Sequence, residues 1–504
     1  MTRPFRLDAV AERLEARGLL RGRSGGDATL AGIAEDSRVV GTGDLFCAWK
    51  GVGADGHDFA DAAVAAGAAG LLVERQLADD VPQLLVTDGR RAAAHAAALA
   101  FEDPADALTL VGVTGTNGKS TTVAIVRQLV GEGAASIGTL GVRGEDGEPL
   151  LDSTLTTPGP VGLARTLAAL VEKGIRTVAM EVSSHALDQG RADALRFDVA
   201  AFTNLSRDHL DYHGSESAYL EAKLRLLDLL GPQAIVVYNA DEPAWEPIES
   251  RPLRRLSFSA TAASASVCAE DVMPHEEGTD FRLATPAGGW PVALPLLGAF
   301  NVENALAAAT CALALGRPGR EIAERLQTLP QTPGRLERIA TTPCPVLRDY
   351  AHSPEALERV LEALRPLVAG RLIVVFGAGG DRDRGKRPEM GGAVQKAADI
   401  AIVTSDNPRT EDPERILDDI TAGMDAGYLR EVDRREAIRM ALERARAGDL
   451  VLLAGKGHET NQLFGTESVP FDEREVVAEL LAEAAAEGLP APEPPLAANG
   501  GGEW

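Results

Sequence analysis

Apolar runs alternate with helical patterns through the middle of the chain. The runs are rich in β-branched or aromatic residues and predict strands at residues 108–115, 176–184, 198–206 and 233–239. Helical patterns separate several of these strands, most clearly STTVAIVRQLV at 120–130, which favours a mostly parallel sheet. Residues 251–297 differ, because short alternating pieces with Pro and Gly predict an antiparallel extension there before a helix at 301–316.

The same alternation continues on both sides of this region and predicts an α/β protein of three domains. Residues 69–75 and 82–88 predict buried strands, and residues 91–102 predict a helix. Three strand-then-loop units in the C-terminal part predict a second doubly wound, Rossmann-like sheet, at residues 371–380, 398–408 and 448–459. Breaks at Pro104 and in PQTPG predict domains at residues 1–105, 106–333 and 334–487, with a disordered tail at 488–504.

Composition narrows the functional classes. The 504 residues carry 75 acidic and 50 basic side chains, a net charge of -25, which argues against general binding to nucleic acid or to an anionic membrane. The four cysteines form no CxxC pair, so a zinc site or disulfide framework is not expected. No segment reaches the roughly 20 apolar residues of a membrane span. We therefore expect a cytoplasmic protein, and a monomer.

Polar, glycine-rich clusters follow the ends of the apolar runs. They read TGTNGKS, EVSSH, TNLSRDH, GAGGDRDRGK, SDNPR and GKGHE. Because ligands of open parallel sheets bind at the carboxyl ends of strands, this placement predicts a binding site rather than ordinary surface polarity.

The strongest of these motifs is Gly115-Thr116-Asn117-Gly118-Lys119-Ser120, between a predicted strand and a predicted helix. Glycines let backbone N–H groups turn toward phosphates, Lys119 can reach the terminal phosphates, and the Ser120 hydroxyl can bind Mg²⁺. The strict GxxxxGK[ST] pattern has Gly where this chain has Val113, so the motif is a variant P-loop.

The remaining motifs are less specific when each is taken alone. Glu181 at a strand end is placed to share Mg²⁺ with ATP, although the pattern also fits a solvated loop. Residues 203–213 concentrate His and Asp side chains that suit metals or oxyanions. Lys223 lies in a leucine-rich helix, where a snorkelling lysine is the usual case. Ser353 predicts a helix N-cap, and DNP at 406–408 is also a good turn.

Together these segments resemble the Mur ligase family across nearly the whole chain, excluding the tail. DSR (36–38) and GDLF (43–46) precede TGTNGKS, EVSSH, NLSRDHLDYHG, GAGGDRDRGKRP, DNPRTEDP and AGKGHE in the family's order. The resemblance implies a domain for a UDP-sugar peptide, a central P-loop-type ATPase domain with a mostly parallel sheet, and a mobile C-terminal domain for the incoming amino acid.

The resemblance also implies the reaction and its substrates. It points to ATP-dependent addition of meso-diaminopimelate to UDP-N-acetylmuramoyl-L-alanyl-D-glutamate, through an acyl phosphate, in cytoplasmic peptidoglycan precursor synthesis. Mg²⁺ is the implied cofactor and ATP the co-substrate. The implied catalytic residues are Lys119, His209 and Lys223, and the implied metal ligands are Ser120, Glu181, His209 and Lys223, the last carbamylated.

The family's binding residues carry over to three groups of positions. Those implied for ATP are Gly115, Thr116, Asn117, Gly118, Lys119, Ser120, Thr121, Asn301, Arg335 and Asp349. Those implied for the UDP-sugar peptide are Glu35, Ser37, Gly53, Ala54, Asp55, Thr156, Thr157, Ser183, Gln189 and Arg191. Those implied for diaminopimelate are Arg382, Asp406, Asn407, Pro408, Arg409, Gly455 and Glu459. Relatives often carry an apolar residue where this chain has Glu35.

Two other functions fit parts of the pattern. A folylpolyglutamate synthetase shares the ATP chemistry, but DSR, GDLF and DNPR count against it. A nucleotide-sensing scaffold without turnover would lack the acidic ligands and Lys223. A dehydrogenase is excluded because Arg382 stands at the third glycine position of GxGxxG.

Overall fold

The structure is a computed structural model that describes residues 3–51, 53–78, 80–151 and 155–486; the predicted tail lies outside the described residues. The chain divides into two compact units, which we describe separately. The first unit comprises the chain up to Glu270 with residues 283–290 and 303–326. The second comprises residues 271–282 and 291–302 and the chain from Gln327 onward.

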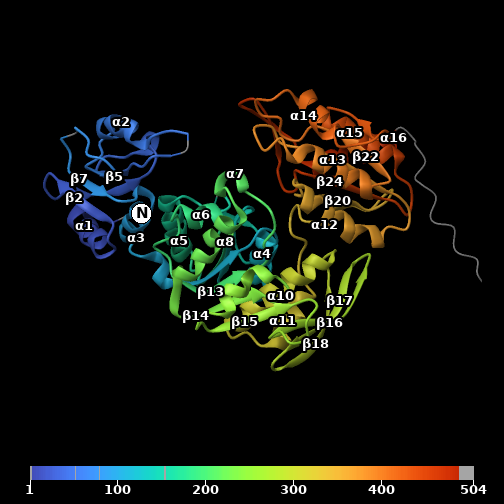
Figure 1. Ribbon diagram of the computed structural model, residues 1–504, viewed down its shortest axis with the longest axis horizontal. Coiled ribbons are helices and arrows are strands. Elements are labelled where there is room, and N and C mark those ends of the chain that lie inside the picture. Colours follow the sequence, from blue (N-terminus) through green and yellow to red (C-terminus); the bar gives the residue numbers. More distant parts are fainter. Residues whose placement is uncertain (1–2, 52, 79, 152–154, 487–504) are drawn as a thin grey trace, which may run out of the picture. The chain divides into compact units, whose positions relative to one another are not determined.

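The N-terminal part of the first unit is a small α/β module (blue in Figure 1). Its five-stranded sheet has the order β2 (Leu20–Ser24), β7 (Gln83–Val86), β6 (Gly70–Val73), β5 (Asp44–Cys47) and β4 (Gly32–Ala34), antiparallel only between β2 and β7. Helices α1 (Leu7–Ala16) and α3 (Gly89–Ala100) cover one face and α2 (Ala60–Ala65) the other. β1 (Phe5–Arg6) pairs with β3 (Thr29–Leu30). The predicted strands and helix of this region are confirmed.

A large mostly parallel sheet forms the centre of the first unit. Its order is β11 (Pro149–Leu151), β10 (Gly141–Arg143), β9 (Ala134–Gly138), β12 (Thr177–Glu181), β8 (Thr109–Thr114), β13 (Phe197–Phe202), β14 (Leu230–Asn239), β15 (Arg255–Ser259), β16 (Val267–His275), β17 (Gly278–Thr285) and β18 (Gly288–Leu294). The strands from β9 to β16 are parallel. This confirms the α/β prediction with a mostly parallel sheet.

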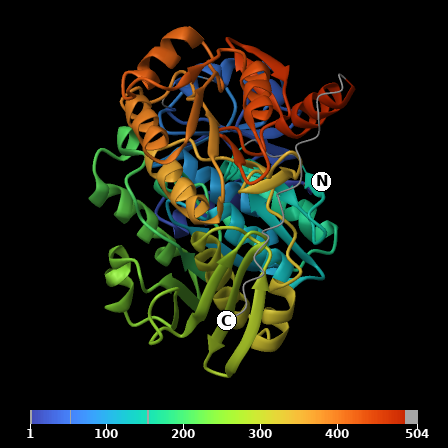
Figure 2. The same cartoon turned by 90° about the vertical axis from the view of Figure 1, so that its right-hand side faces the viewer.

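The prediction of an antiparallel extension at 251–297 is wrong for two strand pairings, β14 with β15 and β15 with β16. β15 runs parallel to β14, because the turns of α9 (Glu246–Glu249) carry the chain back across the sheet. β16 begins parallel to β15. The chain turns between the two strands where the Asp241 carboxylate accepts hydrogen bonds from Ser259 Oγ, Ala260 N and Thr261 Oγ1. β16, β17 and β18 are consecutive neighbours with short connections, which only antiparallel strands allow (Figure 2).

Helices cover both faces of the parallel part of this sheet. Leu110, Val178 and Met180 face α5 (Pro160–Glu172), which contributes Leu163 and Leu167 to one core. Helix α4 (Lys119–Val130) packs on β9 and β12 from the other face. The first unit also holds α6 (Ser184–Asp188), α7 (Leu210–His213), α8 (Glu216–Leu224), most of α10 (Ala299–Ala314) and α11 (Gly319–Leu326). Polar loops therefore emerge only at the strand ends.

The second unit contains a six-stranded doubly wound sheet (orange to red in Figure 1). The order is β19 (Glu337–Ala340), β20 (Val346–Asp349), β24 (Leu450–Ala454), β21 (Leu372–Phe376), β22 (Ile400–Val403) and β23 (Leu429–Arg430), antiparallel only at β19. Strand residues on one face of this sheet pack against α12 (Pro354–Leu364), α13 (Lys386–Ala397) and α14 (Pro413–Thr421). Those on the other face pack against α15 (Arg434–Arg444) and α16 (Glu473–Ala486). β25 (Asn461–Phe464) and β26 (Glu467–Pro470) form a hairpin.

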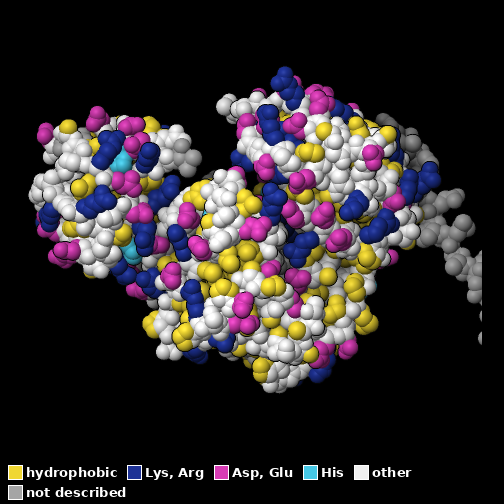
Figure 3. All heavy atoms as spheres, viewed as in Figure 1, with side chains coloured by type: hydrophobic (Ala, Val, Ile, Leu, Met, Phe, Trp, Pro, Cys, Tyr) yellow, Lys and Arg dark blue, Asp and Glu magenta, His cyan; other side chains and the backbone are white. Residues whose placement is uncertain are grey.

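Two surface features bear on function. On the face drawn in Figure 3, acidic and basic side chains are interspersed rather than gathered into one basic patch. Within the described residues, no helix combines the length and apolar character that crossing a membrane requires.

One buried ion pair supports two strand ends of the second sheet. Arg434 Nε and Nη2 donate to Glu473 Oε1 at 2.9 and 2.7 Å, and both side chains are fully buried. Arg434 Nη2 also donates to Ala454 O, at the end of β24, at 2.9 Å, and Arg434 Nη1 donates to Ser405 O, just after β22, at 3.3 Å.

We expect Glu473→Ala to lower the free energy of unfolding by about 3–5 kcal/mol, because it leaves a buried guanidinium without its counter-charge. Chemical denaturation, followed through the unfolding transition of the second unit, measures this change in the free energy of unfolding. The control is Glu479→Ala, which removes an exposed partner of Arg435 and should cost less than about 1 kcal/mol. Equal effects of the two variants would refute the role of the buried pair.

Candidate active site

The variant P-loop lies where β8 ends and α4 begins. Gly118 is the N-cap residue of α4 and has φ +85°. Because glycine has no side chain, it does not occupy the first N–H groups of the helix. Gly115 has φ +147°, and a Cβ there would overlap Thr203 Oγ1. Glycine is therefore required at this position for steric reasons. The first N–H groups of a helix can bind an anion, so the geometry of this loop fits the predicted phosphate contact.

Neighbouring strand β13 holds the P-loop in place through the residues that follow it. Asn204 O accepts from Thr116 N at 2.8 Å, and Asn204 Oδ1 accepts from Asn117 N at 2.9 Å. Thr203 Oγ1 donates to Asn117 O at 2.7 Å, and Ser206 N donates to Thr116 Oγ1 at 3.0 Å. The parallel pairing of β8 and β13 makes this contact possible, because it brings both strand ends to one edge.

Two lysines converge on the carbonyl groups of the same loop. Lys119 Nζ donates to Gly115 O at 2.9 Å and to Thr116 O at 2.7 Å. Lys223 Nζ, from α8, donates to Gly115 O at 2.8 Å and lies 4.2 Å from the Tyr219 ring centroid. Lys223 is only 1% exposed, so the snorkelling alternative is wrong. Burial, and then the charge of Lys119, hold the Lys223 pKa well below its ordinary value.

Glu181 lies on the other side of the loop, at the end of β12. The strand register pairs it with Val113, two residues before the loop. Its side chain is buried, and Oε1 accepts from Thr139 N at 2.7 Å. A Cβ at Gly138 would overlap Glu181 Oε1, so the neighbouring strand must carry glycine there. The structure therefore excludes a solvated loop for Glu181 and places a carboxylate beside the P-loop strand.

The histidine-rich segment forms an aromatic cluster close to Lys223. The His185 ring centroid lies 4.7 Å from that of His209 and 5.4 Å from that of His213. His213 in turn lies 5.2 Å from Tyr219, whose hydroxyl is 3.2 Å from Thr116 Oγ1. Burial lowers the pKa of all three histidines, that of His185 to about 4. Neutral imidazole is the form that binds metals, and a lowered pKa favours that form in His209.

A third group of predicted residues surrounds the start of α6. Thr157 Oγ1 donates to Glu181 O at 2.8 Å, and Ser183 N donates back to Thr157 Oγ1 at 3.1 Å. Arg191 Nη1 donates to Thr157 O at 2.9 Å, and Arg191 Nη2 donates to Gln189 Oε1 at 2.7 Å. Thr156 Oγ1 is 3.0 Å from Thr139 Oγ1. The structure thus brings five predicted contacts of the UDP-sugar peptide together.

The predicted residues of the N-terminal module have local structural roles. The Glu35 side chain lies beside the start of α5, where a Cβ at Gly159 would overlap its Oε1. Its Oε2 is buried without a hydrogen-bond partner among the described residues. Burial raises the pKa of Glu35.

The loop that ends at Asp55 is held by a buried histidine. Asp55 Oδ1 lies 2.5 Å from His57 Nδ1, and His57 Nε2 accepts from Glu74 N at 2.9 Å. Asp55 thereby anchors the predicted Gly53 and Ala54 positions. Ser37 starts the short 3₁₀ helix Ser37–Val39.

In the second unit, Arg335 and Asp349 lie next to each other at the end of β20. Asp349 Oδ2 accepts from Leu336 N at 2.7 Å, and Arg335 packs 4.7 Å from the Tyr350 ring centroid. Burial raises the pKa of Asp349. Asn301, on α10, is buried and donates to Leu297 O at 2.8 Å. Ser353 is confirmed as the N-cap of α12, because its Oγ accepts from Ala356 N.

The residues predicted for the amino acid gather at the ends of β21, β22 and β24. Asn407 Nδ2 donates to Glu459 Oε2 at 2.7 Å. Lys456, which sequence reasoning missed, is buried and donates to Asn407 Oδ1 at 3.2 Å and to Glu459 Oε2 at 3.3 Å. Asp406 Oδ2 is buried without a hydrogen-bond partner among the described residues, and a Cβ at Gly455 would overlap it.

The two predicted arginines differ in exposure. Arg409 is half-buried and donates to Gly380 O at 2.7 Å, and Arg382 is exposed. Pro408 is buried, and its carbonyl group lies where a Cβ at Gly380 would be. The free-energy cost of leaving Arg409 without a carboxylate partner is therefore smaller than the sequence alone suggests.

Sequence reasoning missed several side chains that shape the site. Asn304 Oδ1 lies where a Cβ at Gly118 would be, so α10 approaches the P-loop directly. The sequence could have predicted Asn304, because NVEN places Asn301 and Asn304 three residues apart, on one side of a helix. Thr139 and Lys456 carried no comparable signal, since their partners are distant or lie in another motif.

Three family models match the chain. "Mur ligase family, catalytic domain" matches residues 29–111, "Mur ligase middle domain" matches residues 113–312, and "Mur ligase, glutamate ligase domain" matches residues 334–457.

Individual proteins match over most of their length. A UDP-N-acetylmuramoyl-L-alanyl-D-glutamate–2,6-diaminopimelate ligase from Geobacillus kaustophilus is 43% identical over 90% of this chain and 95% of its own. A solved structure of a ligase of the same name has 35% identity and a TM-score of 0.65, covering 91% of this chain and 96% of its own. Folylpolyglutamate synthase from Mycobacterium tuberculosis shares the fold, with 18% identity, a TM-score of 0.61 and coverage of 72% and 92%.

Proposed function

The chain belongs to the Mur ligase family, and on that premise we propose that it ligates meso-diaminopimelate to UDP-N-acetylmuramoyl-L-alanyl-D-glutamate with ATP. The relative from Geobacillus kaustophilus and the solved structure of the same name support this substrate pair. A folylpolyglutamate synthetase is disfavoured, because that enzyme's structure matches at lower identity and over less of this chain.

The observation that carries the proposal is the meeting of a phosphate loop, a buried carboxylate and a buried lysine at one sheet edge. A free carboxylate is a poor acyl donor, so the substrate carboxylate must first attack the γ-phosphate of ATP, releasing ADP and forming an acyl phosphate. The amine of the second substrate then attacks the carbonyl carbon, loses a proton, and phosphate leaves with the C–O bonding electrons. Lys119 and the N–H groups of the P-loop stabilise the charge on the transferring phosphate.

The residues around the loop fit divalent metal ions. Ser120 and Glu181 offer oxygen ligands at one side of the P-loop, and His209 and Lys223 lie at the other. Among the described residues, no group of three or more His, Cys, Asp or Glu side chains is arranged to hold a metal by itself. Mg²⁺ here would therefore depend on oxygens from nucleotide or from a modified lysine, and when bound it neutralises phosphate charge.

We propose that Lys223 is the modified lysine. Its lowered pKa favours the neutral amine, which is the form that adds carbon dioxide. Carbamylation adds carbon dioxide to this neutral amine, releases a proton and gives an anion with oxygen ligands, which a hard metal prefers. Lys223 lies too deep to act as a surface charge.

We propose that the second unit selects the amino acid through charge. Meso-diaminopimelate differs from lysine by a carboxylate beside its distal amine. Arg382 and Arg409 follow neighbouring strands and are the proposed partners of that carboxylate. Asn407 and Glu459 bind the Lys456 ammonium, and Asp406, Asn407 and Glu459 are the proposed acceptors for the substrate's distal ammonium. We also propose that the enzyme acts in the cytoplasm as a monomer.

Lys119→Ala should reduce ligation by at least about a hundredfold, because it removes one preorganised charge from the transferring phosphate. Steady-state turnover with ATP and the UDP-linked dipeptide measures the loss. Lys173→Ala, an exposed lysine in the same unit, is the control and should remain active. Near-normal ligation by folded Lys119→Ala would exclude the phosphate role.

Lys223→Ala should be almost inactive and should lose a carbamate carbonyl signal seen by ¹³C NMR after exchange with ¹³C-bicarbonate. Millimolar short carboxylic acids should partly restore its activity by supplying oxygen ligands. Lys223→Arg should stay inactive, because a guanidinium group neither carbamylates nor binds metal. Full activity of Lys223→Arg would refute the carbamate.

The wild type should strongly prefer meso-diaminopimelate to L-lysine, and Arg409→Ala should lose most of that preference. A hydrogen bond to a charged group contributes about 1.5–3 kcal/mol, or roughly 10- to 150-fold in KM for diaminopimelate. The KM for ATP should change little. Equal use of both amino acids by the wild type, or intact discrimination in Arg409→Ala, would contradict this assignment.

A further inference from the structure

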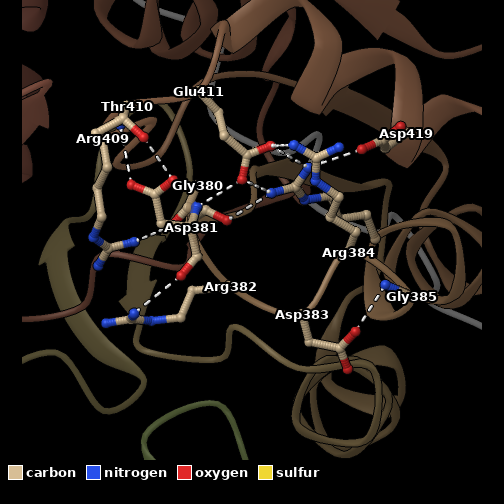
Figure 4. A network of polar contacts seen from close by, with 12 residues as sticks. Gly380, Asp381, Arg382, Asp383, Arg384, Gly385, Arg409, Thr410, Glu411 and Asp419 are labelled. Atoms are coloured by element: carbon tan, nitrogen blue, oxygen red, sulfur yellow. Dashed lines mark hydrogen bonds and ion pairs between the residues drawn. The ribbon is translucent and has the colours of Figure 1, made fainter. Parts of the chain in front are cut away.

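Two loops carry the proposed carboxylate-binding arginines, and a network of polar contacts ties them together (Figure 4). The first loop, residues 377–385, follows β21 and carries Arg382. The second, residues 404–412, follows β22 and carries Arg409. Arg409 Nη1 donates to Gly380 O at 2.7 Å, and Gly380 N donates to Asn407 O at 2.9 Å.

A carboxylate in each loop also accepts hydrogen bonds from the other loop. Asp381, in the first loop, accepts from Thr410 N at 3.1 Å and from Thr410 Oγ1 at 2.7 Å. Glu411, in the second loop, accepts from Asp381 N at 2.6 Å. Thr410 and Glu411 directly follow Arg409 in the chain. Each loop therefore fixes the backbone that carries the other loop's arginine.

Both arginine-bearing segments adopt backbone conformations that need external support. Arg409 has φ +52° and Asp381, next to Arg382, has φ +53°. The left-handed region is unfavourable for residues with a Cβ, so such conformations persist only where surrounding contacts hold them. The reciprocal contacts supply that support at these two positions.

A buried arginine anchors the network to the helical layer. Arg387, on α13, is 0% exposed and donates from Nη2 to Glu411 Oε1 at 2.8 Å and from Nη1 to Glu411 Oε2 at 3.1 Å. Its Nη1 also donates to Asp419 Oδ2 at 2.8 Å, on α14. The Arg387 guanidinium holds the pKa of Glu411 near 2, so this carboxylate stays ionised at neutral pH. A lone buried charge would be costly, so Arg387 depends on Glu411 and Asp419 together.

We propose that Glu411 and Arg387 are positioning residues that set the spacing and direction of Arg382 and Arg409 for the distal carboxylate of the amino-acid substrate. The inference rests on the proposed function for the identity of that substrate. Neither residue needs to touch substrate. Glu411 acts through the backbone of Asp381 and Thr410, and Arg387 acts by fixing Glu411.

The test is Glu411→Gln in the full-length enzyme, which keeps the side-chain shape and removes the charge. A misplacement of about 1 Å can cost up to about a hundredfold, so we expect the KM for meso-diaminopimelate to rise roughly 10- to 100-fold. The KM values for ATP and the UDP-linked dipeptide should change less than about threefold. The preference over L-lysine should fall in parallel.

Two further variants separate positioning from stability. Glu479→Gln removes an exposed ion pair with Arg435 elsewhere in the same unit and should leave all three KM values unchanged. Asp381→Asn alters an exposed loop carboxylate, so it should preserve the fold and still raise the KM for diaminopimelate. Unchanged diaminopimelate KM in folded Glu411→Gln or Asp381→Asn would overturn the proposal.

A double-mutant cycle tests whether Glu411 acts through Arg409. If it does, adding Glu411→Gln to Arg409→Ala should raise the KM by less than the product of the two separate effects. Multiplicative effects would overturn the proposed route. If the wild type ligated a different amino acid, and Glu411→Gln raised the KM for that one, the positioning role would stand and the proposed substrate would be wrong.

Discussion

The lateral pairing of three parallel strands is the constraint on which the candidate site depends. β12, β8 and β13 are neighbours in register, so Glu181, the P-loop and Thr203 reach the same edge of the sheet. Their closeness leaves no room for a side chain at Gly115 or Gly138. A one-residue slip in either pairing would turn Glu181 or Thr203 to the opposite face. Strand pairing therefore sets where the P-loop lies, and the side chains of Thr203 and Asn204 hold its backbone.

Burial of ionisable groups is the second determinant, and it has two different outcomes in this molecule. Arg434 and Glu473 are buried as a paired charge that ties a helix to strand ends, which is a structural arrangement. Lys223 is buried beside Lys119 and a backbone carbonyl, and its pKa falls because desolvation disfavours the ammonium. The same desolvation cost makes Arg434 depend on Glu473 in one place and favours the neutral amine of Lys223 in the other.

The sequence predicted the sheets and the polar strand ends because both follow from local periodicity. It missed the direction of β15, because direction depends on how the chain crosses the sheet between strands. It left Lys223 open, because a helical pattern does not reveal that Gly115, far away in sequence, covers this position. Lys456 and Glu411 were missed for a related reason, because their partners Asn407 and Arg387 lie in other segments of the chain. The site residues that were predicted came mainly from resemblance, and their ligand contacts stay predictions.

The two proposed anion sites differ in what supplies their positive charge, and the loop lengths explain why. Residues 115–118 separate β8 from α4, so the helix start lies at the strand end and its N–H groups point toward the proposed phosphate site. Residues 377–385 separate β21 from α13, so that helix starts away from the strand end. Guanidinium groups must then supply the positive charge. Side chains on long loops are less fixed than helical N–H groups, which is why this edge needs the buried Arg387 and Glu411, and the P-loop edge does not.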